Sequence, residues 1–164
     1  MTLFLRRGMA SFISVIVVLC CGISKAQSVS GTETGGVEEG IRAREKACVS
    51  NLRLLNVAQI TYWGGDDTKG FAGRLKQLGP DGEGLLNAAA VSGEKDGYRF
   101  RLVPDKIAGE AGPFKHYKLI AQPAQRLSRR QRSYYTDETG VIRFTERKRE
   151  PASTDPPLEP PKER

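Results

Sequence analysis

The chain has 164 residues, of which 38% are hydrophobic, and this length suffices for one domain with a modest core. Its 26 basic and 19 acidic residues give a formal charge of +7. The mature chain derived below carries a formal charge of only +4, which is mildly basic and not typical of a dedicated nucleic-acid-binding protein, so a nucleic-acid partner is not expected.

The N-terminus has the three parts of a secretory signal. Two arginines precede an apolar run over residues 8–24, and Ser24 and Ala26 place small side chains at the −3 and −1 positions of a cut before Gln27. We therefore predict that residues 1–26 are a signal peptide cleaved between Ala26 and Gln27. The mature protein would then be extracytoplasmic, in the periplasm or secreted.

A retained membrane anchor is the alternative to cleavage. Residues 9–24 would then remain in the inner membrane as a single pass, with the domain outside, because the arginines before them favour the cytoplasmic side. Membrane contact is expected only in this case. The run is short for a span, which needs about 20 apolar residues, so cleavage is favoured.

Cleavage also fixes the charge and the cysteine content of the mature chain. Residues 1–26 carry three basic residues and no acidic one, so the formal charge falls from +7 to +4. Only Cys48 remains, which rules out an internal disulfide. The domain must therefore be held together by its core, where Cys48 is expected as a small buried residue.

A flexible linker and then a long helix are predicted next. Small polar residues and glycine dominate residues 27–39, the predicted linker. The spacing of apolar residues then predicts an amphipathic helix whose firm part runs from Ile41 to Tyr62, with a stop at the glycines after Trp63. Its buried face is formed by Ile41, Cys48, Leu52, Leu55, Gln59 and Tyr62, and is widened by Ala47, Leu54 and Ala58.

The rest of the domain, residues 40–149, is predicted to contain short helical turns and an antiparallel sheet. Turns are expected around Phe71–Leu78 and Leu85–Val91. Alternation of apolar and polar residues predicts strands at Tyr98–Val103, His116–Gln122, Ser133–Thr136 and Val141–Phe144. The fold class is therefore α+β, with one long N-terminal amphipathic helix packed on a small antiparallel sheet of three to four strands.

The last fifteen residues form a proline-rich tail. Five of residues 150–164 are proline, which prevents a helix and disfavours an inner strand. We predict an extended, solvated and disordered tail that takes no part in the core.

Four sequence segments occur in a characteristic order and spacing. They are NLRLLNVAQITY (residues 51–62), LKQLG (75–79), SGEKDGYRF (92–100) and RSYYTDETGVIR (132–143). Together they resemble the globular part of bacterial type IV pilin-like proteins, in particular relatives of the major pseudopilin of type II secretion. The resemblance covers residues 40–145. It implies a pilin-like α+β domain and protein partners in the cell envelope, among them pilus or secretion components.

The start of the chain departs from the pilin pattern. Gly8 stands where the leader glycine of a pilin would be, but Met9 follows it and Ile13 occupies the position of the usual glutamate. The predicted linker also interrupts the helix before the domain. We therefore expect an exported, non-enzymatic structural or interaction module of the envelope. The alternative is a membrane-anchored pseudopilin-like component of a type II secretion or type IV pilus system.

No residue pattern indicates catalysis, a cofactor or a metal site. His116 is the single histidine and has no visible catalytic partner, and Cys48 lies within an apolar helical stripe, where a nucleophile is not expected. The acidic, glycine-containing segments at residues 64–67 and 79–84 lack the ligand spacing of a calcium loop and are typical of turns. We expect a protein that is not an enzyme and holds no cofactor.

The sharpest charge cluster is formed by Arg126, Arg129, Arg130 and Arg132. It offers a patch for an anionic partner and supports a further alternative, a basic anion-binding periplasmic protein. The ordinary interpretation is a solvated loop before a strand. Tyr134 and Tyr135 follow the cluster, but neighbours on a strand point to opposite faces. At most one of them can join a binding surface, and the other should belong to the core.

Overall fold

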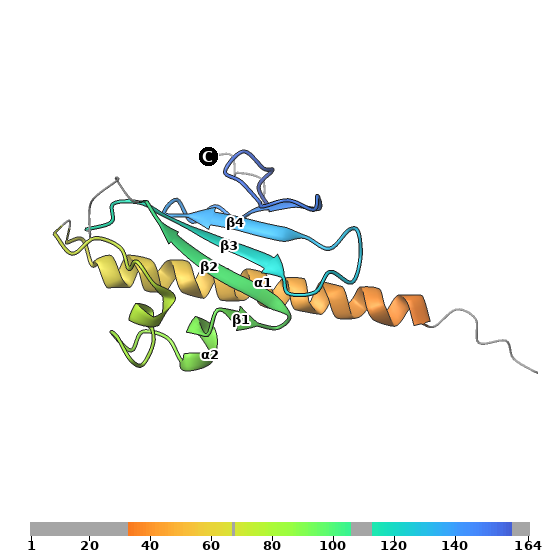
Figure 1. The fold of residues 1–164 in the computed structure, drawn as a ribbon, viewed down its shortest axis with the longest axis horizontal. Helices are drawn as coiled ribbons and strands as arrows, with labels where there is room; N and C mark the ends of the chain where they lie inside the picture. Colours follow the sequence, from red (N-terminus) through yellow and green to blue (C-terminus); the bar gives the residue numbers. More distant parts are fainter. Residues whose placement is uncertain (1–32, 67, 106–112, 159–164) are drawn as a thin grey trace, which may run out of the picture. The chain divides into compact units, whose positions relative to one another are not determined.

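The computed structural model describes residues 33–66, 68–105 and 113–158 and has an α+β architecture (Figure 1). A long helix, α1 (Glu33–Trp63), comes first and lies across one face of an antiparallel sheet. The sheet has the strand order β1-β2-β3-β4-β5, so each strand pairs with its neighbours in the chain. The predicted fold class is confirmed at this level, with five strands in place of the predicted three to four.

The strands follow one another as a meander of hairpins. They are β1 (Glu94–Lys95), β2 (Tyr98–Pro104), β3 (Tyr117–Pro123), β4 (Ser133–Asp137) and β5 (Arg143–Thr145). Two short helical segments, η1 (Leu75–Leu78) and α2 (Ala88–Val91), precede them. The sequence did not predict β1, because two residues are too few to show alternation. Asp96 and Gly97 join β1 to β2 with positive φ values of 52° and 77°, as a two-residue hairpin turn requires.

The helix begins earlier than the sequence predicted. Residues 33–39, which were assigned to the linker, are helical, whereas residues 27–32 lie outside the described residues. Acidic residues stabilise the first turns of a helix because their negative charge interacts favourably with the positive N-terminal end of the helix dipole. Glu38 also lies 4.0 Å from Arg42, one turn later. These charge interactions, and the continuation of the helix from the packed part of α1, outweigh the helix stability that is lost at the glycines. Residues 35–40 are exposed, and Figure 1 shows this end of α1 extending beyond the sheet.

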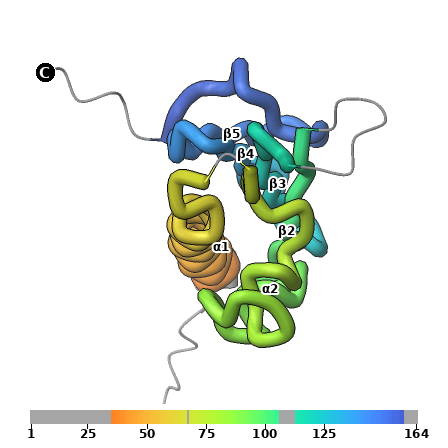
Figure 2. Tube along the Cα trace, turned by 90° about the vertical axis from the view of Figure 1, so that its left-hand side faces the viewer, coloured from red at the N-terminus to blue at the C-terminus, as the bar shows by residue number. Residues whose placement is uncertain are grey.

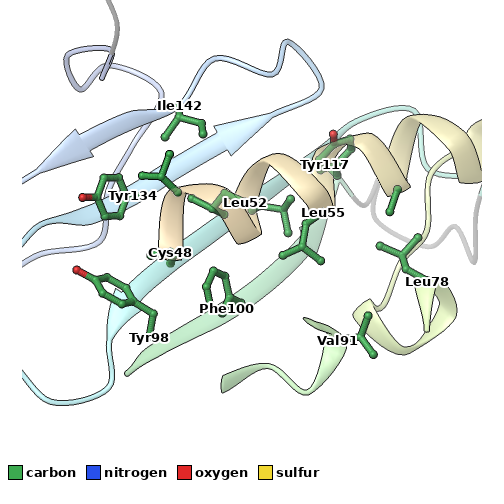
Figure 3. Packing of buried hydrophobic residues seen from close by; sticks show 14 of the residues in the cluster. Cys48, Leu52, Leu55, Leu78, Val91, Tyr98, Phe100, Tyr117, Tyr134 and Ile142 are labelled. Atoms are coloured by element: carbon green, nitrogen blue, oxygen red, sulfur yellow. The ribbon is translucent and has the colours of Figure 1, made fainter. Parts of the chain in front are cut away.

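The hydrophobic core lies between α1 and the sheet (Figure 3). Cys48, Leu52 and Leu55 of α1 are fully buried, as their spacing predicted. Alternate residues of the three central strands face them, namely Tyr98, Phe100, Tyr117, Leu119, Ala121 and Tyr134. This arrangement leaves the opposite face of the sheet to be covered by another part of the chain.

That opposite face is covered by the C-terminal segment, residues 146–158. Ile120 and Tyr135 on this face are buried, with exposed fractions of 1% and 9%. The segment then runs along the outer edge of β5. There the N–H of Phe144 donates to the carbonyl of Pro156 (3.1 Å), and the N–H of Leu158 donates to the carbonyl of Ile142 (2.8 Å). The prediction of a solvated tail is therefore wrong for residues 150–158, while residues 159–164 lie outside the described residues.

An ion pair holds the C-terminal segment in a tight turn. The guanidinium of Arg149 donates to both carboxylate oxygens of Asp155, and the N–H of Ala152 donates to Oδ2 of the same carboxylate (2.8 Å). The hydrogen bonds from Arg149 lower the pKa of Asp155 below its usual value. Proline is compatible with this path because the segment pairs only along a sheet edge, where an N–H is not needed at every residue.

Candidate interaction surface

The face of α1 that points away from the sheet carries an apolar stripe. Leu54, Val57 and Ile60 have exposed fractions of 50%, 64% and 44%. A spacing of three residues places these side chains next to one another along one side of a helix. We call these three residues the α1 stripe. Figure 2 looks along α1 and shows that no described element covers the side away from the sheet.

The first half of the same helix face is polar. Its exposed residues are Glu39, Arg42, Lys46, Ser50 and Arg53. A helix that packs on a sheet is normally polar on its outer face, so this half needs no special explanation, whereas the second half does. Isolated exposed apolar residues are common in proteins. A contiguous apolar row on an otherwise charged helix is typical of a contact surface.

An aromatic pocket adjoins the α1 stripe at the C-terminal end of the helix. Its volume is about 410 Å³, and Ile60 belongs to both the stripe and the pocket. The pocket is lined by Ile60, Trp63, Gly70, Phe71, Phe114, Lys115, His116 and Glu138. The rings of Trp63 and Phe71 lie 5.6 Å apart. This volume falls within the range of sites that enclose a ligand or a partner's anchoring side chain, about 300–1,000 Å³.

Backbone pairing between two separate loops forms one wall of the aromatic pocket. The N–H of Phe71 donates to the carbonyl of Phe114 over 2.8 Å, in an isolated antiparallel bridge. Gly70 permits this close approach. Its φ is +66°, and a Cβ atom at this position would lie 2.7 Å from both the backbone nitrogen and the backbone oxygen of Phe114. Any side chain at position 70 would therefore separate the two loops and deform the pocket.

A histidine–carboxylate pair lies at the rim of the aromatic pocket. Nδ1 of His116 is 2.7 Å from Oε1 of Glu138, and the His116 side chain is 62% exposed. His116 directly precedes β3, one residue outside the strand in which the sequence placed it, and it lies at the surface. The sequence did not reveal its partner. Among the described residues, no serine, threonine or cysteine lines this pocket for His116 to activate. The pair can offer polar contacts to whatever occupies the pocket.

The four arginines of the predicted patch do not form one surface. Arg126 donates to three backbone carbonyls, those of Arg129 (3.3 Å), Glu146 (2.9 Å) and Arg147 (3.4 Å). Arg132 lies 3.4 Å from Oε1 of Glu146 and 4.4 Å above the ring of Phe144. These two arginines attach the loop to the C-terminal segment. Arg129 and Arg130 are exposed and form no ion pair with the part of the chain that the structure describes.

A second pocket next to these arginines has balanced charge. Its volume is about 420 Å³, and it is lined by Glu38, Ile41, Arg42, Glu45, Ser128, Arg130, Gln131, Arg132 and Glu146. Three acidic side chains therefore face three basic ones. Carboxylates at this distance from the arginines weaken the attraction that a phosphate or sulfate would experience. The geometry does not favour an anion site here.

The remaining predicted site residues are buried or lie outside the described residues. Tyr134 and Tyr135 are both buried, so neither joins an exposed binding surface, because the C-terminal segment covers the face that Tyr135 occupies. Cys48 is fully buried, and this burial raises the pKa of its thiol, which makes it a poor nucleophile. The predicted cleavage residues Ala26 and Gln27 lie outside the described residues.

Within the part of the chain that the structure describes, no group of three or more His, Cys, Asp or Glu side chains could hold a metal ion. The acidic segments at residues 64–66 and 79–84 form turns. At the first of them, Oδ1 of Asp66 accepts a hydrogen bond from the N–H of Thr68 (2.8 Å). None of the described helices is long and apolar enough to cross a membrane.

Sequence reasoning missed the α1 stripe by placing Leu54 on the buried face. The signal was present, because Leu54, Val57 and Ile60 are interleaved with the buried residues Leu55 and Ala58. Apolar residues therefore lie on both the buried and the outer side of the second half of α1, which is more than one packed face requires. The aromatic pocket had no comparable signal, since it joins residues from four distant parts of the chain.

Comparisons with protein-family models, curated proteins and solved structures found no match to this chain. The resemblance to pilin-like proteins therefore remains a prediction from the residues of the four segments.

Proposed function

We propose that this protein is an exported, non-enzymatic interaction module of the bacterial cell envelope, with a pilin-like α+β domain. It binds a protein partner through the α1 stripe and the aromatic pocket. The observation that supports this function best is the apolar second half of the outer face of α1, which leads through Ile60 into the pocket. The order of a long helix followed by an antiparallel meander is compatible with the pilin-like resemblance.

The chemistry of the surface suits a protein partner. Aromatic and aliphatic side chains are enriched in the centres of protein interfaces, and charged side chains in the rim. Here the stripe and the aromatic walls would form the centre, while Lys115, His116 and Glu138 would form the polar rim. Burying an apolar side chain contributes about 1.5–3 kcal/mol for full burial, so the half-exposed stripe residues leave part of this free energy available for binding.

Docking can be tested with two matched substitutions on α1. Val57→Glu places a charge in the middle of the stripe, whereas Val37→Glu makes the same change at another exposed position of the helix, where the valine is 54% exposed. In a native size fractionation of envelope extracts, Val57→Glu should move the protein from larger assemblies to the free form. The proposal fails if the two variants fractionate alike.

The export prediction has its own test. Cell fractionation combined with mass spectrometry of the N-terminal peptide should find a mature form that begins at Gln27, outside the cytoplasm. A mature protein that keeps residues 9–26 in the membrane fraction would contradict cleavage.

A membrane-anchored pseudopilin-like component is the second candidate function. One observation favours it: residues 33–39 of the predicted linker belong to α1. This candidate requires the retained N-terminus described in the preceding test. It also requires that the protein assemble with envelope secretion or pilus components in that anchored form.

A further inference from the structure

We infer that the loop between β3 and β4 and the residues after β5 form one peripheral membrane-binding surface, whose partner is a bilayer of anionic phospholipids. The two segments, residues 124–132 and 146–149, lie apart in the sequence. The guanidinium of Arg126 joins them, because it donates to one backbone carbonyl of the first segment and to two of the second. We call five exposed side chains of the two segments the basic face, namely Leu127, Arg129, Arg130, Arg147 and Lys148.

The excess positive charge of the predicted mature chain lies in these two segments. They hold seven basic residues and one acidic residue, a formal charge of +6, whereas the mature chain as a whole carries +4. The four cations of the basic face form no ion pair within the described part of the chain. The carboxylate of Glu146, between the two segments, is engaged with Arg132 (3.4 Å). The charges of the basic face are therefore available to an external anion.

Two carboxylates of α1 lie near Arg130. Glu38 and Glu45 line the second pocket together with it. Glu38 is paired with Arg42, and Glu45 accepts a hydrogen bond from the N–H of Arg132 (2.9 Å). Counting both carboxylates against the +6 of the two segments still leaves +4. The excess therefore lies with the exposed side chains of the basic face, and not in the pocket, whose own charges are balanced.

An exposed leucine among these cations favours a bilayer over a soluble anion. Leu127 is 43% exposed and lies between Arg126 and Arg129 in the sequence. Its N–H donates to Oε1 of Gln131 over 2.8 Å, and Gln131 is fully buried, so the loop is held with Leu127 at the surface. At a bilayer an apolar side chain enters the acyl boundary while long cationic side chains stay at the level of the phosphates. A soluble polyanion offers no such apolar environment for the leucine.

Membrane contact at the basic face leaves the α1 stripe and the aromatic pocket accessible. Ser133 at the start of β4 pairs with Thr145 at the end of β5, so both segments of the basic face lie at this end of the sheet. The turn between β4 and β5, which carries Glu138 of the aromatic pocket, lies at the opposite end (Figure 1). The basic face therefore acts independently of the stripe. It also requires no retained anchor, unlike the membrane contact expected from the sequence.

Vesicle flotation of the protein isolated from its cell tests the basic face. The protein should float with vesicles of equal parts phosphatidylglycerol and phosphatidylcholine, and not with phosphatidylcholine alone. Arg129→Gln combined with Lys148→Gln should weaken binding about tenfold or more, because each cation near an anionic bilayer adds to the attraction. Arg74→Gln with Lys76→Gln removes the same two kinds of charge from exposed positions at η1 and should leave binding unchanged. An equal effect of the two pairs, or no binding to the anionic vesicles, would overturn the inference.

A fluorophore at position 127 distinguishes a bilayer from an acidic protein. Leu127→Cys is placed in a parent with Cys20→Ala and Cys21→Ala, which keeps the fully buried Cys48, and is labelled with an environment-sensitive dye. Its emission should shift to the blue with the anionic vesicles and not with soluble polyglutamate. No shift on bound vesicles would overturn the inference, and tighter binding of polyglutamate than of vesicles would assign the basic face to an acidic protein instead.

One variant separates this surface from the proposed protein-binding surface. Val57→Glu lies in the α1 stripe and should leave vesicle binding unchanged. A loss of vesicle binding in Val57→Glu, equal to that of the Arg129 and Lys148 pair, would overturn the assignment of membrane binding to the basic face. Absence of vesicle binding in every form would leave the proposed function of the stripe standing.

Discussion

The side-chain amide of Gln59 forms hydrogen bonds with both backbone groups of Ala72. Nε2 of Gln59 donates to the carbonyl of Ala72 over 3.1 Å, and Oε1 accepts from the N–H of Ala72 over 2.9 Å. Both residues are fully buried. This double contact fixes the loop after α1 to the helix, directly beside Phe71, and so helps to position the wall of the aromatic pocket.

Replacing Gln59 should therefore destabilise the fold. Gln59→Leu keeps the approximate volume but leaves the buried N–H and carbonyl of Ala72 without partners, which costs about 1–3 kcal/mol for each group and about 2–6 kcal/mol in the free energy of unfolding. Urea unfolding measures this loss. The matched control is Gln77→Leu, because Gln77 accepts from the N–H groups of Gly73 and Arg74 at an exposed site. A similar loss in both variants would contradict the role of the Gln59–Ala72 contact.

Alkaline pH should unfold the protein steeply. Burial raises the pKa of Tyr98, Tyr117 and Tyr134 well above the usual value of 10, and that of Tyr135 to about 12. In the unfolded chain these groups lose their protons near pH 10, while in the folded chain they keep them. Stability is therefore unaffected below pH 10 and falls as the pH rises above it, by up to about 1.4 kcal/mol per pH unit for each tyrosine.

Two absorbance measurements check this expectation. Phenolate absorbance and far-ultraviolet circular dichroism should change together, above pH 10, because the four tyrosines ionise only when the chain unfolds. Complete ionisation of the tyrosines near pH 10 in a chain that stays folded would contradict the buried positions of these side chains.

Asp155 should control the order of the C-terminal segment. Asp155→Asn weakens the pair with Arg149 and should loosen the C-terminal segment. The amide of Phe144, which donates to Pro156 of the segment, and the amide of Leu158, which donates to Ile142, should therefore exchange hydrogen faster. The core amides of β3 should be unaffected.

The same opening should occur in the parent chain at acidic pH. The pKa of Asp155 is lowered in the folded chain, so the stabilising effect of its carboxylate is present above about pH 4 and is lost as the pH falls through the pKa of the folded chain.

A matched change elsewhere serves as the control for the segment. Asp81 is exposed in the turn between η1 and α2, and Asp81→Asn removes the same charge without touching the C-terminal segment. Exchange at Phe144 and Leu158 should remain at the parent rate in this variant. Equal rates in Asp81→Asn and Asp155→Asn would show that the ion pair does not hold the segment.

The arginines of the patch predicted for an anionic partner should differ in their effects on stability. Arg126→Ala removes three hydrogen bonds to backbone carbonyls and should cost about 1–2 kcal/mol. Arg130→Ala removes an exposed side chain and should stay within about 0.5 kcal/mol of the parent. Chemical unfolding of both variants compares them directly. Similar stability for both would mean that Arg126 does not attach the loop to the C-terminal segment.

Local periodicity was sufficient to predict most of the fold. The buried face from Ile41 to Tyr62 identifies α1 and places its end within one residue, and the alternation in Tyr98–Val103 places the second strand within one residue. The start of α1 and the path of residues 150–158 depend on interactions that periodicity does not show. Glycines predicted a flexible chain before α1, but the packed helix continues through them. Prolines predicted a flexible chain at residues 150–158, but the Arg149–Asp155 contact holds this segment in place.

The candidate surface was less accessible from the sequence. Periodicity identifies apolar residues, but it does not show where the buried arc of a helix ends, so Leu54 was placed inside although it is half exposed. The aromatic pocket depends on contacts between residues far apart in the chain, such as Phe71 with Phe114 and His116 with Glu138. Such pairs leave no local pattern.

We propose that the α1 stripe contacts a protein in the cell envelope, and site-specific photo-cross-linking in the native cell can detect this contact. A photoreactive residue at Val57 should give defined protein adducts, and one at Val37 on the same helix should give few. Adducts whose mass is twice that of the chain would identify a second copy, and other masses a different partner. No adduct above the Val37 level would contradict the claim that the stripe is an interaction surface.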